Sequence, residues 1–228
     1  MQRIFEPKFC DCSYGFRPQR SPHLAIARVE KYLKRGYQWV LEVDIEKFFD
    51  SVNQKKLIDL VAEEIADGRV LRLIQSFLRC GVMEDMQVEY RTAGTPQGGV
   101  ISPLLANIYL HPYDERMTQE GYKAVRFADD IVILCRSRTE AEKALRRTRE
   151  ILEGELSLKL NSQKTKITHK RKTFEFLGFL SGCGYSKLKA MGMLFLKDLL
   201  YARRPGLLPA KGQRLRRAGC CKSAWSVR

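Results

Sequence analysis

The stretch that most restricts the fold of this chain is residues 125–134, VRFADDIVIL, in which two apolar arms flank a polar centre. Short β-branched arms around a tight turn are typical of a β-hairpin, so we expect the carboxylates of Asp129 and Asp130 at its tip. Adjacent carboxylates on a rigid ribbon repel each other, and a divalent cation removes that repulsion. Oxygen ligands that leave room for water and phosphate are what Mg²⁺ accepts. The alternative interpretation is an Asp-Asp turn without a metal, because aspartate is common in turns.

The sequence carries a strong surplus of positive charge. Its 228 residues include 41 Lys and Arg against 26 Asp and Glu, which gives a net charge of +15. Residues 201–228 contribute eight basic side chains and no acidic one, so the first 200 residues still carry +7. A surplus of this size favours a polyanion as the partner.

Nothing in the sequence predicts a membrane partner or a disulfide framework. No apolar run is long enough to span a bilayer, and the N-terminus lacks the pattern of a secretory leader, so we expect a cytoplasmic protein. The seven cysteines are odd in number and scattered, which favours reduced thiols. Cys10-x-Cys12 and Cys220-Cys221 lack the second pair that a zinc site requires.

The order of polar and apolar residues predicts a mixture of helices and strands. Ser21-Pro22 is a helix cap followed by proline in the first turn, and this helix should end at Gly36. Residues 39–46 alternate in polarity like a half-buried strand, which places Asp44 at the strand end on the less apolar face. The other predicted elements are a helix capped by Asn53 and broken at Gly68, a helix over residues 69–79, a weak strand pair within 83–93, a helix that starts at a Ser102-Pro103 cap, a helix from a Thr139-x-x-Glu142 capping box to about Glu153, two short strands within 158–167, and one strand over 174–180.

Two further segments have residue types that suit phosphate binding. In residues 92–99, TAGTPQGG, the glycines allow the backbone to approach a ligand, and Gln97 brings an amide that can donate and accept. This loop leads into the helix N-terminus at Ser102, which favours phosphates. Arg17 is suited to a bidentate contact with a triphosphate. The alternative interpretations are a flexible connection and a surface arginine.

Asp44 and the Asp129-Asp130 pair are 85 residues apart, so the sheet must bring them together. Three carboxylates at one place would hold two divalent ions. Two ions about 3.5–4 Å apart stabilise the attacking and the leaving oxygen of an in-line phosphoryl displacement. The pattern therefore predicts the chemistry of a polymerase.

Six segments of the chain occur in the order in which one family of polymerases carries them. Together they resemble the reverse transcriptase encoded by bacterial and organellar group II introns, also called an intron maturase, over about residues 5–180. The segments are SYGFRPQRSPHLAI (13–26), VDIEKFFDSV (43–52), GTPQGGVISPLLANIYLH (94–111), FADD (127–130), LKLNSQKTKI (158–167) and FEFLGF (174–179).

The resemblance implies an α+β fold. It predicts a reverse-transcriptase palm, with an antiparallel sheet backed by helices, and partial fingers without a recognisable thumb. Residues 1–40 would form the partial fingers segment and residues 41–180 the palm with the catalytic core. The resemblance leaves the basic tail at residues 181–228 unassigned.

The resemblance also implies the metal ligands. Asp44 and Asp129 would bind two Mg²⁺ ions, for which Mn²⁺ would be a substitute. Asp130 would take a weaker part, and the Ile45 carbonyl would be a backbone ligand. Lys164 would protonate the leaving pyrophosphate, which requires a lysine pKa near the operating pH.

The nucleotide contacts follow from the same resemblance. Phe49 would be the steric gate against a ribose 2′-hydroxyl, with Phe48 as the less favoured candidate. Gln97 and the backbone of Gly98 would line the incoming dNTP. Arg17 would contact its triphosphate.

The resemblance predicts RNA-directed DNA synthesis on an intron RNA template with a DNA primer and dNTPs. The resemblance also implies two departures from the family: Phe127 takes the place of the usual tyrosine, and the chain would start after the first finger segments and lack a recognisable thumb after Leu180. We therefore expect RNA binding with weak synthesis. A non-catalytic RNA-binding splicing cofactor, or its remnant, is the main alternative. The reverse transcriptase of a retron or of a diversity-generating element is a third, because it shares the three carboxylates.

Overall fold

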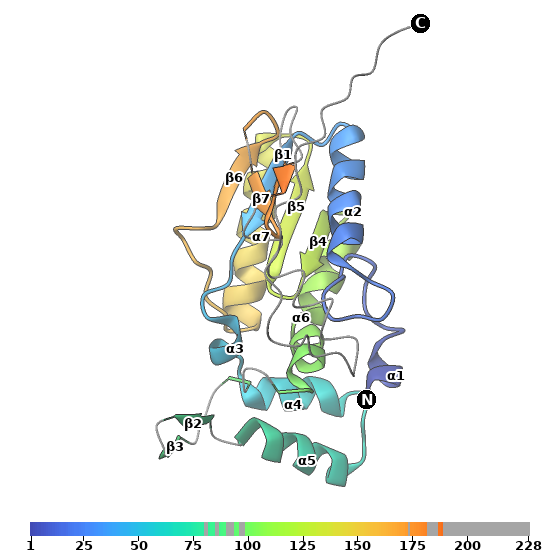
Figure 1. Cartoon of the computed structure of the whole chain (residues 1–228), viewed down its shortest axis with the longest axis vertical. Coiled ribbons are helices and arrows are strands. Elements are labelled where there is room, and N and C mark those ends of the chain that lie inside the picture. The colour runs from blue at the N-terminus through green and yellow to red at the C-terminus, as the bar shows by residue number, and fades with distance from the viewer. Residues whose placement is uncertain are drawn as a thin grey trace, which may run out of the picture.

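Helices and antiparallel strands alternate along the chain in this computed structural model (Figure 1). The structure describes residues 1–79, 82–84, 87–89, 94–95, 99–172, 174–181 and 187–188. No helix in these ranges combines the length and the apolarity that crossing a bilayer requires. The elements are α1 (Gln2–Phe5), α2 (Pro22–Lys34), β1 (Trp39–Val43), α3 (Phe48–Ser51), α4 (Gln54–Ala62), α5 (Gly68–Arg79), β2 (Val82–Glu84), β3 (Gln87–Glu89), α6 (Ser102–Gln119), β4 (Lys123–Phe127), β5 (Asp130–Cys135), α7 (Arg138–Arg149), the π-helix η1 (Glu150–Glu155), β6 (Lys166–His169), β7 (Phe174–Phe176), β8 (Phe179–Ser181) and β9 (Lys187–Leu188).

Four antiparallel strands form the central sheet, in the order β4-β5-β1-β6. In β1, Trp39 pairs with Cys135 of β5 on one side and with His169 of β6 on the other. The strands β4 and β5 form the hairpin that the sequence predicts. Beyond β4, the N-terminal segment adds a parallel bridge between Ser13 and Arg126. The sheet therefore draws together segments from both ends of the described chain.

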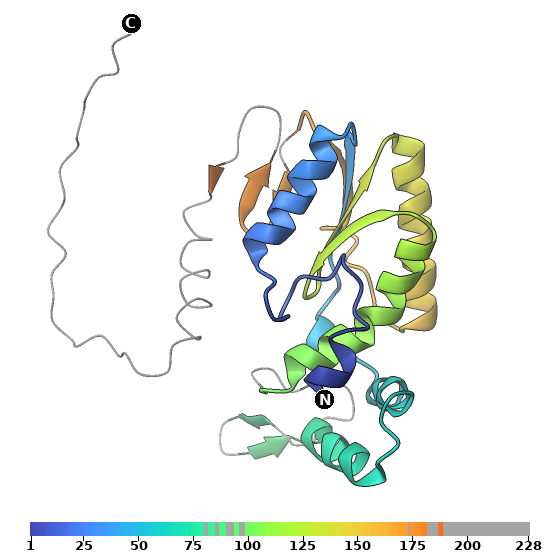
Figure 2. The same cartoon turned by 90° about the vertical axis from the view of Figure 1, so that its right-hand side faces the viewer.

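The two faces of the sheet are covered by different elements (Figure 2). On one face, Leu41 and Ile133 belong to the larger core, which includes α6 and α7. On the other face, Val40 and Val132 pack with side chains of α2 and β7. Successive strand residues point to opposite faces, so Asp44 ends β1 on the α2–β7 face, as the alternation in the sequence predicts.

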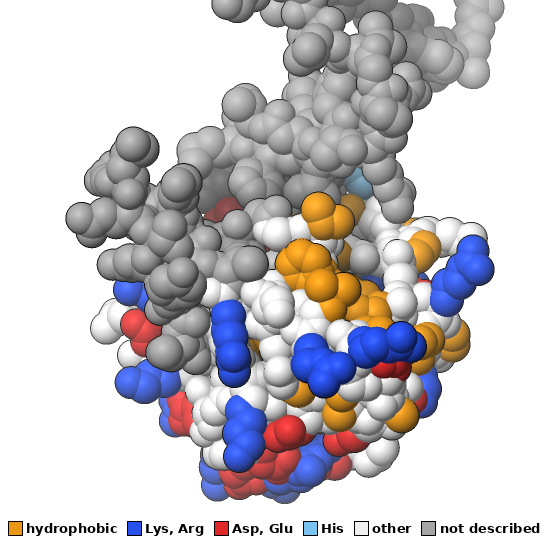
Figure 3. All heavy atoms as spheres, turned by 90° about the horizontal axis from the view of Figure 1, so that it is seen from below, with side chains coloured by type: hydrophobic (Ala, Val, Ile, Leu, Met, Phe, Trp, Pro, Cys, Tyr) orange, Lys and Arg blue, Asp and Glu red, His pale blue; other side chains and the backbone are white. Residues whose placement is uncertain are grey.

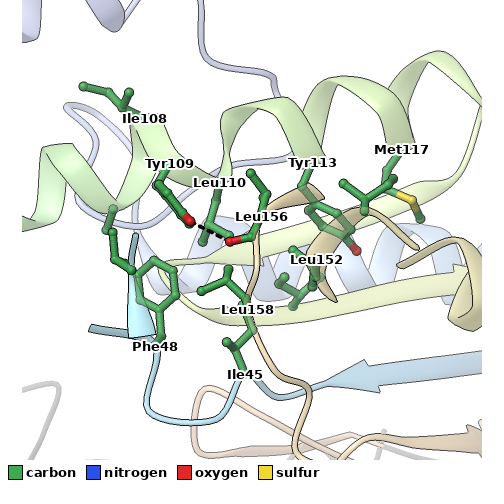
Figure 4. Close-up of a cluster of buried hydrophobic side chains, with 14 of the residues drawn as sticks. Ile45, Phe48, Ile108, Tyr109, Leu110, Tyr113, Met117, Leu152, Leu156 and Leu158 are labelled. Atoms are coloured by element: carbon green, nitrogen blue, oxygen red, sulfur yellow. Dashed lines mark hydrogen bonds between the residues drawn. The ribbon is translucent and has the colours of Figure 1, made fainter. Parts of the chain in front are cut away.

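The larger core holds α6 against the segment that follows η1 (Figure 4). Tyr113 and Met117 of α6 lie beside Leu152, and the Tyr109 hydroxyl donates a hydrogen bond to the Leu156 carbonyl at 2.5 Å. Burying a large apolar side chain contributes roughly 1.5–3 kcal/mol. This packing fixes the helix that precedes the β4–β5 hairpin.

Local predictions for helix caps and one strand pair are confirmed. The Ser21 hydroxyl caps α2 by accepting a hydrogen bond from the Leu24 amide at 3.3 Å. Asn53 caps α4 by accepting one from the Lys56 amide at 3.1 Å. The strand pair predicted within residues 83–93 forms as β2–β3. The α+β fold, an antiparallel sheet backed by helices, is confirmed as well, whereas the division near residue 40 stays a prediction.

Two predicted helix boundaries are wrong. The helix α4 ends at Ala62, so Gly68 does not break it and instead opens α5. The helix α6 begins at Ser102 with proline in its first turn, but its N-cap is Ile101, which provides no side-chain hydrogen bond. The reason is that the Ser102 amide already bonds to the Gly99 carbonyl, at 3.1 Å, so the turn starts earlier than the cap pattern indicates.

The N-cap of α7 lies two residues before the predicted one. The Ser137 hydroxyl accepts a hydrogen bond from the Glu140 amide at 3.1 Å. In return, the Glu140 carboxylate accepts one from the Arg136 amide at 2.8 Å. The sequence contains two overlapping patterns of hydroxyl and glutamate, and the structure uses Ser137 instead of Thr139.

Two strand predictions near the end of the described chain are also wrong in detail. Residues 174–180 form a hairpin instead of one strand, because Phe176 pairs with Phe179 across a two-residue turn. Leu177 and Gly178 in that turn have φ values of 53° and 74°. Of the two strands predicted within 158–167, the first is reduced to a single bridge, and the second forms as β6.

Candidate active site

The β4–β5 hairpin presents two carboxylates at the edge of the sheet. Phe127 pairs with Asp130, so Ala128 and Asp129 form a two-residue turn. Ala128 has a φ of 58°, a left-handed conformation that is uncommon for alanine. Asp129 is half-buried and Asp130 is exposed. The carboxylates thus lie at the hairpin tip, where the sequence predicts them.

Asp44 meets this hairpin at the end of β1. The antiparallel pairing of β1 and β5 runs to Val43 and Ile131. Continuing that register by one residue places Asp44 opposite Asp130, directly beside Asp129. The sheet therefore brings together carboxylates that are 85 residues apart in the sequence.

The backbone carbonyl of Ile45 is turned toward the hairpin. Ile45 forms an isolated antiparallel bridge with Leu160. The hydrogen bonds of that bridge come from neighbouring residues, such as the Asn161 amide, which donates to the Asp44 carbonyl at 2.9 Å. In a pair of this kind, the amide and carbonyl of the central residue point to the opposite side. For Ile45, that side is the one occupied by Asp129.

A pocket of about 440 Å³ opens between the hairpin and α3. Asp44, Asp129 and Lys164 line it together with Phe48 and Phe49. Phe49 is half-buried, whereas Phe48 is 3% exposed and points into the larger core (Figure 4). Although both residues line the pocket, Phe49 is therefore the more accessible of the two to a ligand.

A second pocket, of about 490 Å³, lies on the α2–β7 side of the sheet. Asp130, Asp44 and Lys164 line it, together with Phe176 of β7. Asp44 and Lys164 thus belong to both pockets, while Asp129 lines the first and Asp130 the second. The carboxylates therefore lie between the two pockets.

Burial and mutual repulsion disfavour the charged forms of the hairpin carboxylates. Loss of hydration raises the pKa of Asp129, and the Asp44 charge raises it further. Loss of hydration, followed by the charges of Asp129 and Asp44, raises the pKa of Asp130 to about 6. The Lys164 ammonium lies 3.5 Å from Asp44 Oδ1 and opposes both pKa shifts. Solvent around the exposed Asp130 moderates the repulsion.

The donor set suits a hard divalent cation. In the described part of the chain, no three His, Cys, Asp or Glu side chains gather closely enough to hold a metal ion on their own. Two carboxylates, a carbonyl directed at them and open space for water and phosphate match the way Mg²⁺ is usually bound. A cation would also relieve the repulsion that, after the loss of hydration, raises the pKa of Asp130.

Arg17 has partners other than a nucleotide. Its side chain is 5% exposed, and Nε donates to the Glu6 carboxylate at 2.8 Å. Nη1 donates to the carbonyls of Cys10 and Ser13 at 2.7 and 2.9 Å. The guanidinium also stacks over the ring of Phe9. In this structure the Arg17 guanidinium is held by the N-terminal loop, and its contact with a triphosphate stays a prediction.

Gln97 and Gly98 lie outside the described residues, but the start of their loop is anchored beside the first pocket. The Thr95 amide donates to the Phe49 carbonyl at 2.7 Å. A Cβ on Gly94 would lie 2.7 Å from the same carbonyl oxygen, and Gly94 has a φ of 87°. Glycine permits both the close approach and the positive φ.

A buried network around Arg126 is absent from the predictions made from the sequence. The Arg126 guanidinium contacts Asp114 and Asn107 of α6, the Ser13 hydroxyl and the Ala128 carbonyl. The signal in the sequence is a pair of polar residues seven positions apart on one helix face, facing an arginine within an apolar strand. That signal becomes readable only when helix and strand are known to pack together.

Several known proteins are similar in sequence to this chain. The family model "Reverse transcriptase (RNA-dependent DNA polymerase)" matches residues 1–180. Protein YkfC of Escherichia coli (strain K12) is 34% identical over 217 residues, which cover 78% of this chain and 57% of that protein. Group II intron-encoded protein LtrA of Lactococcus lactis subsp. cremoris is 30% identical over 243 residues, which cover 78% of this chain and 40% of that protein. The chain spans less than two thirds of the length of either relative.

A solved structure gives the same result for the fold. The apo telomerase of Candida tropicalis truncated from its C-terminal domain has a TM-score of 0.57 at 15% identity, covering 78% of this chain and 40% of that chain. At this identity the likeness shows the fold alone. The chain belongs to the reverse transcriptase (RNA-dependent DNA polymerase) family, and its similarity to group II intron-encoded proteins confirms the resemblance found in its sequence.

Proposed function

We propose that this chain contains the catalytic core of an RNA-directed DNA polymerase of the group II intron type. The observation that carries the proposal is that Asp44, Asp129 and Phe49 line one pocket together with Lys164. Carboxylates for a metal, an aromatic side chain and a cation are the groups that a polymerase needs around a deoxynucleoside triphosphate. The register that joins Asp44 to the hairpin supports the same proposal.

In this proposal, Asp44, Asp129 and the Ile45 carbonyl hold Mg²⁺, and Asp130 takes a weaker part. When bound, two such ions stabilise the charge on the attacking and leaving oxygens of a phosphoryl transfer. The chain itself fixes the ligands in place. The strand register sets the position of Asp44, and the two-residue turn sets that of Asp129.

Lys164 is the proposed general acid. Its side chain is 68% exposed, and its ammonium lies 3.5 Å from Asp44 Oδ1. It lines both pockets, so a pyrophosphate that leaves from the metal ligands would meet this ammonium. A proton delivered to the leaving oxygen lowers the barrier of the transfer.

The two pockets would hold different reactants. We assign the pocket with Phe49 to the incoming dNTP, and the pocket with Phe176 to the end of the DNA primer annealed to the intron RNA template. Phe49 then stands where a ribose 2′-hydroxyl would have to fit, because both it and Asp129 line the same space. Asp44, which lines both pockets, would stand between primer and nucleotide.

Primer extension on a poly(rA) template with an oligo(dT) primer tests this proposal. We expect dTTP incorporation that requires Mg²⁺ and stops when EDTA is added. Incorporation that persists without a divalent ion would contradict the assigned site. RNA binding without any incorporation would favour the second candidate function below.

Substitution of the two aromatic residues tests the assignment of the gate. Phe49→Val should let the enzyme incorporate ribonucleotides, because a pocket rejects an added hydroxyl mainly by lack of room. Phe48→Ala is the matched control, and it should cost roughly 3–5 kcal/mol of stability without changing the selectivity of the folded protein. A change of selectivity at Phe48 and none at Phe49 would exchange their roles.

A non-catalytic RNA-binding splicing cofactor is the second candidate, and one surface favours it. On α5, Leu73 and Phe77 are 56% and 46% exposed, and Arg69 and Arg72 are exposed on the same helix. Figure 3, which views the α5 end of the molecule, shows hydrophobic and basic side chains next to each other. Unpaired RNA bases stack on aromatic rings, and their phosphates attract arginine.

Filter binding of RNA separates this candidate from the first. Phe77→Ala combined with Arg72→Ala should weaken RNA binding, and the binding that remains should fall steeply as salt is added. A Mg²⁺-dependent polymerase would still show incorporation on a saturating primer–template. RNA binding that does not respond to salt or to these substitutions would contradict the use of this surface.

A further inference from the structure

The side chain of Arg126 is fully buried, one residue pair away from the pair that closes the turn of the β4–β5 hairpin. Its counterion is Asp114 of α6: Nε lies 2.9 Å from Oδ1, and Nη2 lies 2.5 Å from Oδ2. Burial by itself lowers the pKa of Arg126, but the Asp114 carboxylate raises it above its ordinary value. A buried charge without such a partner would be strongly destabilising. The pair with Asp114 thus lets a charged guanidinium sit in the interior.

The remaining donors of the guanidinium reach the hairpin tip and its surroundings. Nη1 donates to Asn107 Oδ1 and to the Ala128 carbonyl, both at 2.9 Å. Nη2 donates to the Ser13 hydroxyl at 2.8 Å. The Ala128 carbonyl belongs to the peptide bond that joins Ala128 to Asp129. Arg126 therefore holds the peptide bond directly before Asp129.

Gly15 packs closely against the backbone of Ala128 in the same hairpin tip. A Cβ on Gly15 would lie 2.2 Å from the Ala128 amide nitrogen, so no side chain fits there. The Gly15 carbonyl accepts a hydrogen bond from Asn107 Nδ2 at 2.8 Å. Asn107 thus connects the Gly15 loop to the guanidinium. Ala128, with its φ of 58°, lies between these contacts, and an uncommon backbone conformation persists where the surroundings fix it.

We propose that Arg126 is a positioning residue for Asp129 and that Asn107 sets the orientation of its guanidinium. The inference rests on the proposed function, in which Asp129 is a metal ligand. Arg126 lines neither pocket, so it acts through the Ala128 carbonyl. An error of about 1 Å in the position of a group at a reacting centre can cost 10²-fold in rate. A buried network that fixes the peptide bond beside a metal ligand would prevent such a displacement of the ligand.

Two substitutions test the inference, with a third as a matched control. Arg126→Lys keeps the charge but lacks the planar fork that reaches Ala128 and Asn107. Asn107→Leu leaves the charge pair intact and removes the amide that orients it. Tyr113→Phe, on the same helix, removes a buried contact with the Thr148 hydroxyl at 3.3 Å and leaves the hairpin contacts in place.

The readouts are Mn²⁺ binding, followed by electron paramagnetic resonance, and hydrogen–deuterium exchange of the amides at residues 128–130. Both need no DNA synthesis. We expect Arg126→Lys and Asn107→Leu to raise the Mn²⁺ dissociation constant about tenfold or more, as is typical when a partner of a metal ligand is lost. The amides at 128–130 should also exchange faster. Tyr113→Phe should leave both readouts at their wild-type values while lowering thermal stability.

Wild-type Mn²⁺ affinity and wild-type exchange in both hairpin variants would overturn the inference. If Arg126→Lys does not fold, Asn107→Leu decides the question, because its charge pair is intact. A wild-type chain that binds no Mn²⁺ would contradict the proposed function. Even then, unchanged exchange at residues 128–130 in Asn107→Leu would overturn the role of Arg126, and faster exchange would support its hold on the hairpin.

Discussion

Arg17 and Arg126 are both buried, but they connect different parts of the molecule. Arg17 bonds to Glu6, Cys10 and Ser13, all within 11 positions along the chain. Arg126 joins the hairpin to α6 and reaches Ser13 across 113 positions. The first arginine stabilises a local loop, and the second fixes one segment relative to two others.

The contrast explains why the sequence drew attention to Arg17 and not to Arg126. Arg17 stands in a polar, aromatic segment that suggests a ligand, whereas Arg126 reads as one polar residue inside an apolar strand. The partners of Arg126 are distant in the sequence, so the local pattern around it does not reveal its role. We expect the N-terminal loop around Arg17 and the hairpin around Arg126 to differ in function as well as in the sequence separation of their contacts.

The largest expected effect is at the hairpin. Asp129→Asn removes one charge at nearly constant size, so Mg²⁺-dependent synthesis should fall by at least about 10²-fold. Asp11→Asn is the control in the N-terminal loop, where the side chain is 83% exposed and paired with Arg20. It should leave synthesis at the wild-type rate. Primer extension measures both, and equal losses would remove the distinction between the regions.

Gly15 is one of the residues through which the N-terminal loop touches the hairpin, and its substitution should have the next largest effect. Gly15→Ala places a Cβ 2.2 Å from the Ala128 amide nitrogen, so we expect a loss of about 1–3 kcal/mol in stability and a loss of synthesis in the folded protein. Gly154→Ala is the matched control, because nothing lies within 4 Å of its added Cβ. Urea unfolding and primer extension should distinguish the two variants. Equal stability and equal synthesis would mean that the hairpin backbone can shift to accept the added Cβ.

Substitution of Arg17 should affect stability alone. Arg17→Met removes the hydrogen bonds to the N-terminal loop, which should cost roughly 2–4 kcal/mol in the free energy of unfolding. The KM for dTTP should stay at its wild-type value, because the guanidinium contacts the loop. A raised KM without a loss of stability would restore the triphosphate contact that the sequence predicts.

The smallest effect should come from the exposed carboxylate. Because the pKa of Asp130 rises from 3.8 to about 6 on folding, the folded state binds its proton more tightly, and the chain loses stability as the pH rises from about 4 to 6. Asp130→Asn removes that loss. Measured without metal, the melting temperature of the variant should exceed that of the wild type above pH 6, and the difference should vanish near pH 4. A difference that is independent of pH would contradict the raised pKa of Asp130.

Much of the fold follows from local patterns in the sequence. The Ser21 and Asn53 caps, the alternation of residues 39–46 and the apolar arms of the hairpin each reflect contacts within a few residues, so they were predictable. The hairpin of residues 174–180 was not, because Leu177 adopts a φ of 53° in its turn. Leucine carries no turn signal, and the surrounding aromatic residues read as one strand.

Some residues of the candidate site could likewise be predicted from the sequence, and others could not. Resemblance in sequence predicted Asp44, Asp129 and Phe49, and the structure brings these side chains to one pocket. The network of Arg126 and Asn107 depends on how α6 packs against β4, which no stretch of sequence encodes by itself. The sequence therefore predicts the side chains proposed to perform the chemistry. The side chains that position them can be identified only from the fold.

The central claim is that Asp44 and Asp129 act together on one bound cation. A double-mutant cycle of Mn²⁺ affinity, with Asp44→Asn, Asp129→Asn and both substitutions combined, tests it most directly. We predict that each single substitution weakens binding about tenfold or more, and that the combined variant weakens it by much less than the product of the two, because the loss of one ligand already loosens the shared ion. Two effects that multiply in full would mean that the carboxylates act independently, and would contradict a common metal site.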